Sequence, residues 1–167
     1  MADPSNITIR PLTPEDQSFL WEMLYEALYV PEGGEPFPRS IVNLPEISRY
    51  AEGWGKSDDT GLVAVDENDQ PIGAAWIRLM TSGNRGYGYV DDTTPELSIA
   101  VAPRYRGRGV GTKLLVRLFE QTENRYRAIS LSVSSDNPAV RLYLRLGFEV
   151  VTKNGDSLTM VRRMRGD

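Results

Sequence analysis

The decisive stretch of this sequence is Ile99-Ala-Val-Ala-Pro-Arg-Tyr-Arg-Gly-Arg-Gly-Val-Gly-Thr-Lys-Leu-Leu115. It starts inside an apolar, strand-like run, Glu96–Val101, and continues after the glycines with apolar residues at helical spacing. The order is therefore a strand, a glycine-rich loop and a helix of about four turns. The N–H groups and the dipole at the start of such a helix attract an anion, and glycines let the backbone approach it. Because Arg106 and Arg108 add positive charge, the loop is predicted to bind phosphate.

Two common nucleotide-binding patterns do not fit this loop. The Walker A pattern requires Gly-x4-Gly-Lys-Ser/Thr, but Lys113 follows Thr112 rather than a glycine. The dinucleotide fingerprint, Gly-x-Gly-x-x-Gly, follows the first strand of its domain, whereas this loop comes late and has Thr112 at the last glycine position. The phosphate therefore belongs to another kind of ligand.

The rest of the chain alternates between strand and helix patterns. Strands are expected at residues 7–12, 62–65, 72–79, 96–101, 128–133, 148–153 and 157–163. Helices are expected from Pro14 to Tyr29 with Thr13 as N-cap, at residues 45–53, after Gly109, and at residues 137–146 with Gly147 at the end. Loops should cover residues 31–40 and a mobile segment at 82–92, and Asn154-Gly155 should turn the last hairpin. We expect one α+β domain over residues 1–167, in the order β-α-α-β-β-β-α-β-α-β-β.

The composition restricts the chemistry because the 167 residues include no Cys and no His. Thiol nucleophiles, disulfides and the usual zinc ligands are excluded together, so no metal site is expected. The most common general base is missing as well, which leaves carboxylates, Tyr, Lys, hydroxyls and backbone dipoles. A covalent cysteine intermediate is impossible, so any group transfer must occur directly between bound substrates.

The net charge of −4 argues against nucleic acid as the main ligand. Arg104, Arg106, Arg108 and Lys113 nevertheless form a cluster without an acid inside it, which fits a local anion site better. No apolar run is long enough to span a membrane, and the polar start, Met-Ala-Asp-Pro-Ser-Asn, does not have the zones of a signal peptide. We therefore expect a cytoplasmic protein without a membrane partner.

At this point the sequence resembles the GNAT superfamily of acyl-CoA-dependent N-acetyltransferases. The family's pyrophosphate loop has the form Arg/Gln-x-x-Gly-x-Gly/Ala after a strand, and here it reads Arg106-x-x-Gly109-x-Gly111. A second family element follows about 25 residues later as Asn137-Pro-Ala-Val-Arg-Leu-Tyr-Leu-Arg-Leu-Gly-Phe148. The resemblance implies a mixed, mostly antiparallel sheet flanked by about four helices. It also implies acetyl-CoA as donor, a primary amine of a small molecule, peptide or protein as acceptor, and, as in many relatives, a homodimer.

The resemblance assigns roles to particular residues. Ile99, Ala100 and Val101 would splay from the next strand, bind the pantetheine arm and donate to the thioester carbonyl. The pyrophosphate would be held by Arg106, Gly107, Arg108, Gly109, Val110, Gly111 and Thr112. Asn137 would hydrogen-bond the cofactor arm, and Tyr143 would contact the cofactor and protonate the departing thiolate. Trp21, Tyr25, Tyr29, Phe37 and Trp54 lie in the part where relatives form the acceptor pocket. Trp21, Tyr25 and Tyr29 also have helical spacing, which favours core packing for at least one of them.

Glu96 is our choice for the base that deprotonates the amine, since family members often place a Glu there. Many relatives have the base six residues before the position of Val101, whereas Glu96 is five before it, and strand side chains alternate faces. A bulge would restore the direction, and Asp91 and Asp92 are alternative bases. Glu32, Glu35, Asp58 and Asp59 either favour a cationic acceptor or are solvated loop charges.

Less specific readings stay open for each feature. The arginine loop could be a basic turn or a nucleic-acid patch, Tyr143 a core aromatic, and Glu96 a structural strand residue. The same fold could transfer a longer acyl group, depending on the space near Ile99–Val101. It could also be a regulatory CoA-binding module without turnover.

Overall fold

A computed structural model describes residues 6–164 of the chain. The first five residues, which carry most of the argument against a signal peptide, lie outside the described residues. The helices and strands in chain order are β1 (Thr8–Pro11), α1 (Gln17–Glu26), α2 (Pro45–Ser48), β2 (Thr60–Val65), β3 (Pro71–Arg78), β4 (Glu96–Val101), α3 (Val110–Thr122), β5 (Ala128–Ser134), α4 (Ala139–Arg145), β6 (Phe148–Asn154) and β7 (Ser157–Arg163). Short 3-10 turns precede α1, α2 and α3.

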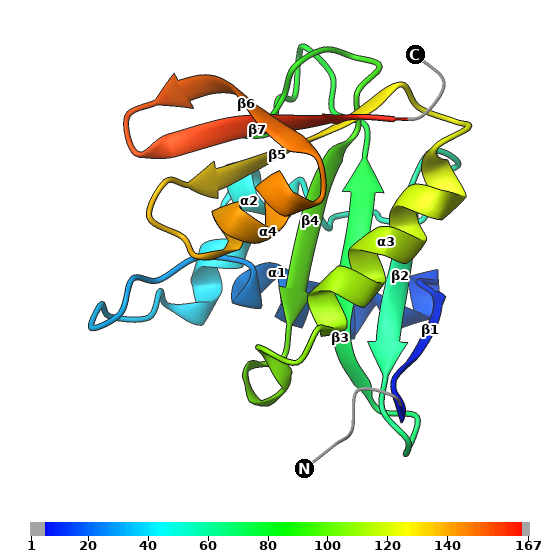
Figure 1. The fold of residues 1–167 in the computed structure, drawn as a ribbon. Helices are drawn as coiled ribbons and strands as arrows, with labels where there is room; N and C mark the ends of the chain where they lie inside the picture. Colours follow the sequence, from blue (N-terminus) through cyan, green and yellow to red (C-terminus); the bar gives the residue numbers. More distant parts are fainter. Residues whose placement is uncertain (1–5, 165–167) are drawn as a thin grey trace.

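One sheet of seven strands runs through the described part of the chain, in the order β1-β2-β3-β4-β5-β7-β6. Neighbouring strands are antiparallel except β4 and β5, which are parallel. In Figure 1, β5, β6 and β7 lie turned away from β1–β4, so the sheet is strongly twisted at its parallel pair. The predicted fold class and order of elements are confirmed.

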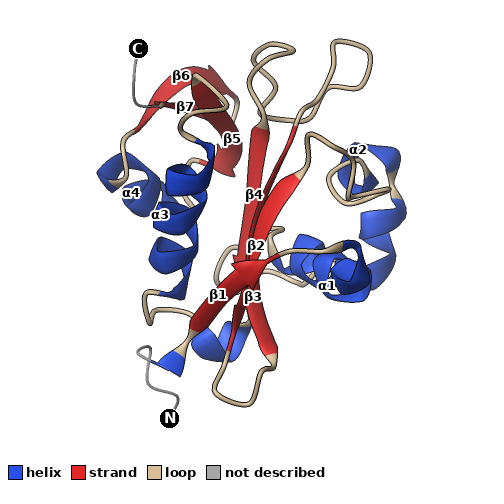
Figure 2. Ribbon diagram, turned by 90° about the vertical axis from the view of Figure 1, so that its right-hand side faces the viewer, coloured by secondary structure: helices blue, strands red, loops and turns tan. Residues whose placement is uncertain are grey.

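Helices cover both faces of the sheet, as Figure 2 shows: α1 and α2 lie on one face, α3 and α4 on the other. The apolar face predicted for α3 is buried, and its members are Val110, Leu114, Leu115, Leu118 and Phe119. Full burial of such side chains contributes roughly 1.5–3 kcal/mol each. A separate core on the opposite face packs Leu20, Leu24 and Trp54 against Trp76 of β3. The sheet is thus fixed between two cores, and the site can form where its strands diverge.

Two helices are shorter than the sequence predicts. The first ends at Glu26 rather than Tyr29, because the Leu28 N–H bonds three residues back, to Tyr25, and the chain then turns toward Pro31. The second covers only Pro45–Ser48 instead of residues 45–53. Beyond it the chain continues in tight turns to Gly53, whose φ of +65° no regular helix allows.

Two other boundaries differ by a residue or two. Helix α4 begins at Ala139, because the Asn137 side chain accepts the Ala139 N–H over 2.9 Å in place of a helical carbonyl. The last hairpin turns at Gly155 and Asp156, since Asn154 still pairs with Ser157. Gly155 has a φ of +63°, so the residue that requires left-handed backbone is the glycine, and the turn lies one residue later than predicted.

Within residues 6–164, no helix is both long enough and apolar enough to cross a membrane.

Candidate active site

Strands β4 and β5 are neighbours over only a short part of their length. Glu96 pairs with Ser130, whose N–H donates to the Pro95 carbonyl over 3.0 Å. No further pair joins the two strands within residues 6–164, so they diverge toward Val101. The splay that the family resemblance implied is therefore present, and we call the space it leaves the β4–β5 gap.

The N–H groups of Ile99 and Val101 face this gap. The Ala102 N–H donates to the Ile72 carbonyl over 2.7 Å, and hydrogen-bonded pairs alternate along an antiparallel ladder. Even-numbered residues of β4 therefore bond to β3, and odd-numbered residues turn their N–H groups toward β5. Beyond Glu96 no strand receives these groups, so β4 offers two backbone donors to a ligand in the gap.

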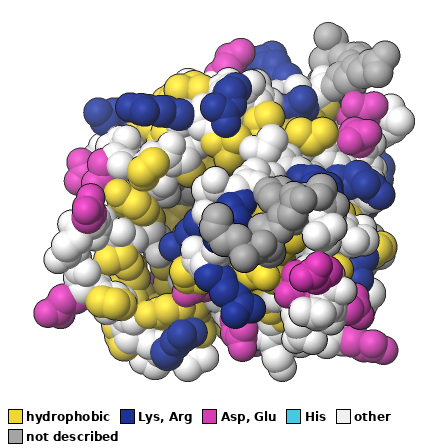
Figure 3. All heavy atoms as spheres, turned by 60° about the horizontal axis from the view of Figure 1, so that its bottom comes forward, with side chains coloured by type: hydrophobic (Ala, Val, Ile, Leu, Met, Phe, Trp, Pro, Cys, Tyr) yellow, Lys and Arg dark blue, Asp and Glu magenta, His cyan; other side chains and the backbone are white. Residues whose placement is uncertain are grey.

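A cavity of about 280 Å³ lies at the gap. Its walls come from the end of α1, from Ile47 and Tyr50, from β4 and β5, and from Asn137 and Tyr143. A groove of about 560 Å³ continues from it along Val101 to Arg106 and shares part of the same lining. Figure 3 shows the end of the molecule where β4 ends and α3 begins: hydrophobic side chains wall a hollow, and Lys and Arg side chains stand beside it.

Glu96 is 3% exposed and forms part of the cavity wall. Its Oε2 accepts hydrogen bonds from the Tyr50 hydroxyl at 2.5 Å and from the Gly88 N–H at 3.0 Å. Its buried Oε1 has no hydrogen-bond partner among the described residues. Burial raises the pKa of Glu96 to about 6, although the bonds from Tyr50 and Gly88 and the charge of Arg49 lower it. The carboxyl can therefore exchange a proton near neutral pH.

The direction of Glu96 needs no bulge. The β3–β4 register is continuous from Arg78↔Glu96 to Gly73↔Val101, so the side chains of Glu96 and Val101 lie on opposite faces. The cavity is lined from both faces, because the strands diverge there, and Glu96 joins Ile99 in its wall. Asp91 and Asp92 do not line this cavity and bond locally to Thr93 and Tyr89.

Tyr50 is a site residue that sequence reasoning missed. Its hydroxyl donates to Glu96 and accepts the Tyr87 N–H over 2.6 Å, so it connects the carboxylate to the β3–β4 loop, residues 79–95. Burial, and next the negative charge of Glu96, raise the pKa of Tyr50, which keeps its proton on the donor side. A Cβ at Gly86 would overlap both Glu96 Oε1 and the Tyr50 hydroxyl. Only glycine lets the loop cover the carboxylate this closely.

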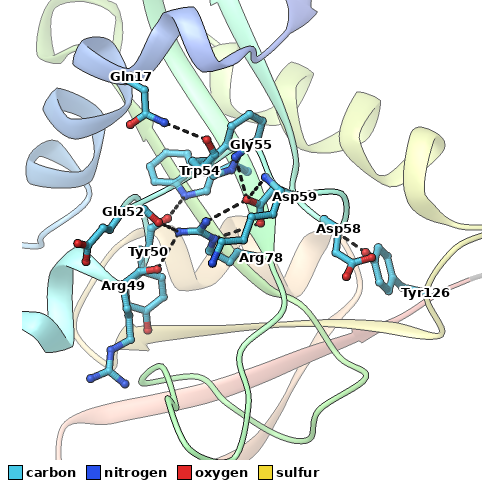
Figure 4. A network of polar contacts seen from close by, with 12 residues as sticks. Gln17, Arg49, Tyr50, Glu52, Trp54, Gly55, Asp58, Asp59, Arg78 and Tyr126 are labelled. Atoms are coloured by element: carbon cyan, nitrogen blue, oxygen red, sulfur yellow. Dashed lines mark hydrogen bonds and ion pairs between the residues drawn. The ribbon is translucent and has the colours of Figure 1, made fainter.

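A buried ion pair holds the backbone on which Tyr50 stands. Figure 4 shows the Arg78 guanidinium directed at Asp59 and at the carbonyls of Arg49 and Glu52. The Arg78 and Asp59 side chains are 7% and 4% exposed and approach to 3.0 Å. Asp59 therefore neither lines the cavity nor stands in solvent, contrary to both sequence-based readings. The Trp76 indole also donates to the Tyr50 carbonyl over 2.9 Å.

Tyr143 lies on α4 and is 9% exposed. Its ring meets Phe148 edge to face at 5.7 Å, and it lines both the cavity and the groove. Burial raises its pKa to about 12, and its hydroxyl makes no hydrogen bond within the described part of the chain. The position of Tyr143 is therefore compatible both with a packing role in the core and with a role in the site.

The glycine loop has the backbone shape that the sequence predicted. Gly107 and Gly109 have φ of +74° and +81°, and α3 starts directly after Gly109. The N–H groups of Val110, Gly111 and Thr112 have no carbonyl four residues back in α3, so they point out of its first turn. This arrangement suits an anion.

The predicted cluster of positive charges is only partly directed at that anion site. Arg106 donates to the Val101 carbonyl over 3.0 Å and lies 3.5 Å from the Glu26 carboxylate. Lys113 donates to the Ile7 carbonyl over 2.6 Å, so it is tied to the chain before β1. Arg106 lines the groove, whereas Lys113 does not.

Asn137 lines both the cavity and the groove. Its Oδ1 accepts the Ala139 N–H at the start of α4, and its Nδ2 donates to no residue in the range 6–164. Among the predicted acceptor aromatics, Tyr29 lines both spaces, and Tyr25 and Phe37 line the groove. Trp21 and Trp54 pack in the core beside α1 instead. No group of three or more acidic side chains that could hold a metal ion occurs in the described residues.

A splayed parallel pair, a glycine loop at a helix start and a buried carboxylate in the cavity between them define the class, an acyl-CoA-type transferase fold. Residues 20–148 match the model of the acetyltransferase (GNAT) family, which is more than half of the chain. The chain therefore belongs to the GNAT family of acetyltransferases.

Individual relatives agree with this assignment. A mycothiol acetyltransferase of Renibacterium salmoninarum is 31% identical over 152 residues, which are 87% of this chain and 41% of that protein. This chain thus spans less than half the length of that relative. The crystal structure of PaiA N-acetyltransferase from Thermoplasma acidophilum with coenzyme A shares the fold, with a TM-score of 0.65, 22% identity and 94% and 98% of the two chains covered. So does the ribosomal-protein-S18-alanine N-acetyltransferase of Escherichia coli, with a TM-score of 0.67, 20% identity and 96% of each chain covered.

Proposed function

We propose that this chain, acting as one domain over residues 1–167, transfers the acetyl group of acetyl-CoA to a primary amine in a ternary complex. One observation carries the proposal: a single cavity at the β4–β5 gap is lined by Glu96 on one side and by Tyr143 on the other. A base, an acid and two backbone donors thus surround one space where the reaction can take place. Membership of the GNAT family supports the choice of donor.

The donor fits the loop and the groove on chemical grounds. The first N–H groups of α3, with the side chain of Arg106, would hold the pyrophosphate, in the segment Arg106 to Thr112. The groove leads from Arg106 past Val101 to the cavity, which gives the pantetheine arm a path. Asn137 has an amide nitrogen available there to hydrogen-bond that arm. The thioester supplies an activated acetyl group in the gap.

Glu96 would accept a proton from the ammonium group of the acceptor, and the neutral amine then attacks the thioester carbonyl carbon. The C–N bond forms and the C–S bond breaks, so the electron pair of that bond leaves with sulfur as thiolate. The new amide gives up the second proton of the nitrogen, which neutralises the thiolate. The N–H groups of Ile99 and Val101 would stabilise the negative charge on the carbonyl oxygen during the attack.

Tyr143 would donate a hydrogen bond to the leaving sulfur. A pKa of about 12 keeps the phenol protonated across the physiological range, so it is always available as a donor. A free thiol has a pKa of about 8.5, so the phenol is the weaker acid. Its contribution is therefore a shared proton that stabilises the thiolate as the C–S bond breaks, rather than a complete transfer.

The donor site is tested by heating the protein with and without acetyl-CoA. A ligand that binds only the folded state stabilises it by about 2.7 kcal/mol at 100 times its Kd, so the melting temperature should rise. Absence of a rise at saturating acetyl-CoA would refute the donor site.

The chemical roles are tested by thiol release from acetyl-CoA with an amine acceptor. Glu96→Gln should lower kcat/KM about 10²- to 10⁴-fold, the usual contribution of a general base. Tyr143→Phe should lower kcat about tenfold or more while the KM for acetyl-CoA stays constant. Tyr126→Phe, which removes a hydroxyl bonded to the Asp58 carbonyl away from the cavity, is the matched control.

Other outcomes of this assay have definite meanings. Wild-type turnover in Tyr143→Phe would exclude Tyr143 as the acid, and wild-type turnover in Glu96→Gln would exclude Glu96 as the base. A rise in melting temperature without thiol release from any amine would identify a CoA-binding module without turnover.

A further inference from the structure

One side of the cavity at the β4–β5 gap is apolar. Leu24, Leu28 and Ile47 form this wall, together with Ala27 and the rings of Tyr29 and Tyr87. Leu24 and Ile47 are 3% and 8% exposed, so the wall is a continuation of the core. An acceptor placed between this wall and the gap must therefore present apolar surface to it.

The strand side of the cavity is mixed and carries almost no charge, since the apolar side chains of Leu97, Ile99, Leu131 and Val133 line it beside small polar ones. Ser98, Ser132, Ser134 and Ser157 line it with small hydroxyl-bearing side chains. Glu96 is the single charged side chain among the described residues that line this space. Its Oε1 is buried beside Gly86 and makes no hydrogen bond to any of them, so the carboxylate keeps an acceptor position that no described residue fills.

The basic side chains nearest to the cavity are already engaged elsewhere. Arg49 donates to the Arg85 carbonyl in the β3–β4 loop and does not line the cavity. Arg106 lies in the groove, on the donor side, against the Val101 carbonyl and Glu26. Among residues 6–164, no Lys or Arg side chain lines the cavity, so a carboxylate or phosphate that an acceptor carried into it would meet no cation in its wall.

From this charge balance we infer that the acceptor is a monocationic primary amine on an uncharged, largely apolar body. Glu96 matches one ammonium group, and the apolar wall accommodates the remainder of the molecule. A carboxylate close to the amine, or a second ammonium group, would lose its hydration without gaining a partner, which is strongly unfavourable. This inference rests on the proposed function, and it deepens that function by excluding free amino acids and polyamines as good acceptors.

Two matched pairs of amines test the inference in the thiol-release assay. Phenylalaninamide and phenylalanine differ in the carboxylate, and butylamine and 1,4-diaminobutane differ in the second ammonium group. We expect kcat/KM to be at least about 100-fold higher for phenylalaninamide than for phenylalanine, since an unpaired charge must be buried in one case only. For butylamine over 1,4-diaminobutane we expect at least about tenfold, because the far ammonium group can partly reach solvent.

The outcomes separate this inference from the proposed function. Equal or greater kcat/KM for phenylalanine or 1,4-diaminobutane would overturn the acceptor class, although the thiol release itself would support the transferase function. Failure of all four amines, in a protein that acetyl-CoA stabilises against heat, would also overturn the acceptor class. Failure of both turnover and stabilisation by acetyl-CoA would refute the proposed function.

A cation added to the apolar wall provides a second test. Leu28 is half-buried and lines both the cavity and the groove, so Leu28→Arg places a guanidinium beside both spaces. Because phenylalanine and phenylalaninamide use the same donor, the ratio of their kcat/KM values cancels an effect on donor binding. This variant should raise the kcat/KM ratio of phenylalanine to phenylalaninamide about tenfold or more, since the carboxylate gains a partner. Val150→Arg, at a position 46% exposed on β6 and outside the cavity, is the matched control and should leave the ratio unchanged. An unchanged ratio in folded Leu28→Arg would contradict the inference.

Discussion

Two buried carboxylates on the same side of the sheet have opposite surroundings. Asp59 is held by the guanidinium of Arg78 through two hydrogen bonds of 3.1 and 3.0 Å. Glu96 receives only a hydroxyl and a backbone N–H, both on one oxygen, and its other oxygen is unpaired within the described chain. Both are almost completely buried, so solvent does not explain the difference.

The difference separates a carboxylate that stabilises the fold from one that is available for chemistry. The guanidinium of Arg78 pairs with Asp59 and also ties the carbonyls of Arg49 and Glu52 in place. Glu96 has no such partner, and burial raises its pKa to about 6, where a base can both take up and release a proton. The Arg78–Asp59 pair therefore supports the backbone that carries Tyr50, and the Tyr50 hydroxyl in turn orients Glu96.

Loss of the ion pair should have the largest effect on stability. Arg78→Ala removes the cation from the buried Asp59 carboxylate and leaves it only the N–H groups of Gly55 and Lys56, which should lower the free energy of unfolding by about 3–5 kcal/mol, measured by urea denaturation. The half-buried pair Arg10–Asp16, with side chains 36% and 12% exposed, is the control, and Arg10→Ala should cost less, about 1 kcal/mol. Equal losses in the two variants would show that the buried pair has no special role.

Closer packing over Glu96 should have the next largest effect. In Gly86→Ala the added methyl overlaps the Glu96 carboxylate and the Tyr50 hydroxyl, so the β3–β4 loop must move. Overpacking of this kind costs about 1–3 kcal/mol, and the displaced base should also reduce turnover. Gly83→Ala is the matched control, because a Cβ there meets nothing within 4 Å, and it should retain wild-type stability and thiol release.

Removal of the charge at Glu96 should stabilise the protein, in contrast to Arg78→Ala. A pKa raised from 4.5 to about 6 means that the folded state favours the protonated carboxyl. The stability that this provides is complete below about pH 4.5 and is lost as the pH rises through about 6. Glu96→Gln should therefore gain up to about 2 kcal/mol at pH 8 and nothing at pH 4, measured by denaturation at both pH values. The exposed Glu120→Gln should show no such pH dependence, and a loss of stability at pH 8 in Glu96→Gln would contradict this account.

The smallest effect is expected for Tyr50→Phe. Without the hydroxyl, Glu96 loses one of the bonds that lower its pKa, so the rise of kcat/KM with pH should move to higher pH. The loss of stability should be about 1 kcal/mol, as for an ordinary hydrogen bond. A pH profile of kcat/KM for the wild type, Tyr50→Phe and the control Tyr126→Phe checks this. An unshifted profile would show that Tyr50 has no part in orienting or tuning the base.

The half of the site that faces the donor could be predicted from the sequence, because its features are local in the chain. A strand, three glycines and a helix follow each other within Glu96–Thr122, and the left-handed φ at Gly107 and Gly109 is what glycine in a tight loop permits. The face of α3 follows from the spacing of its apolar residues. The roles of individual residues in this segment stay predictions that the assays above can test.

The half that faces the acceptor depends on contacts between residues far apart in the chain, which spacing cannot indicate. Tyr50 and Glu96 are 46 residues apart, and they meet only because the β3–β4 loop folds over both. Asp59 lies just before β2 and Arg78 at the end of β3, and the sequence around either residue does not indicate that the two side chains form an ion pair. The ends of α1 and α2 lie earlier than the sequence predicts, because tight turns follow each helix before Pro31 and Gly53.

The single backbone pair between β4 and β5 has a mechanical consequence. The sheet has two parts, β1–β4 and β5–β7. Within residues 6–164 the backbone pair of Glu96 and Ser130 joins them, and α3 and the cores provide the other connections. A molecule in the β4–β5 gap would contact both parts of the sheet, since Ile99 of β4 and Val133 of β5 line the cavity there. A ligand in the gap would therefore hold the two parts of the sheet together, and Glu96 lies at the point where they pair.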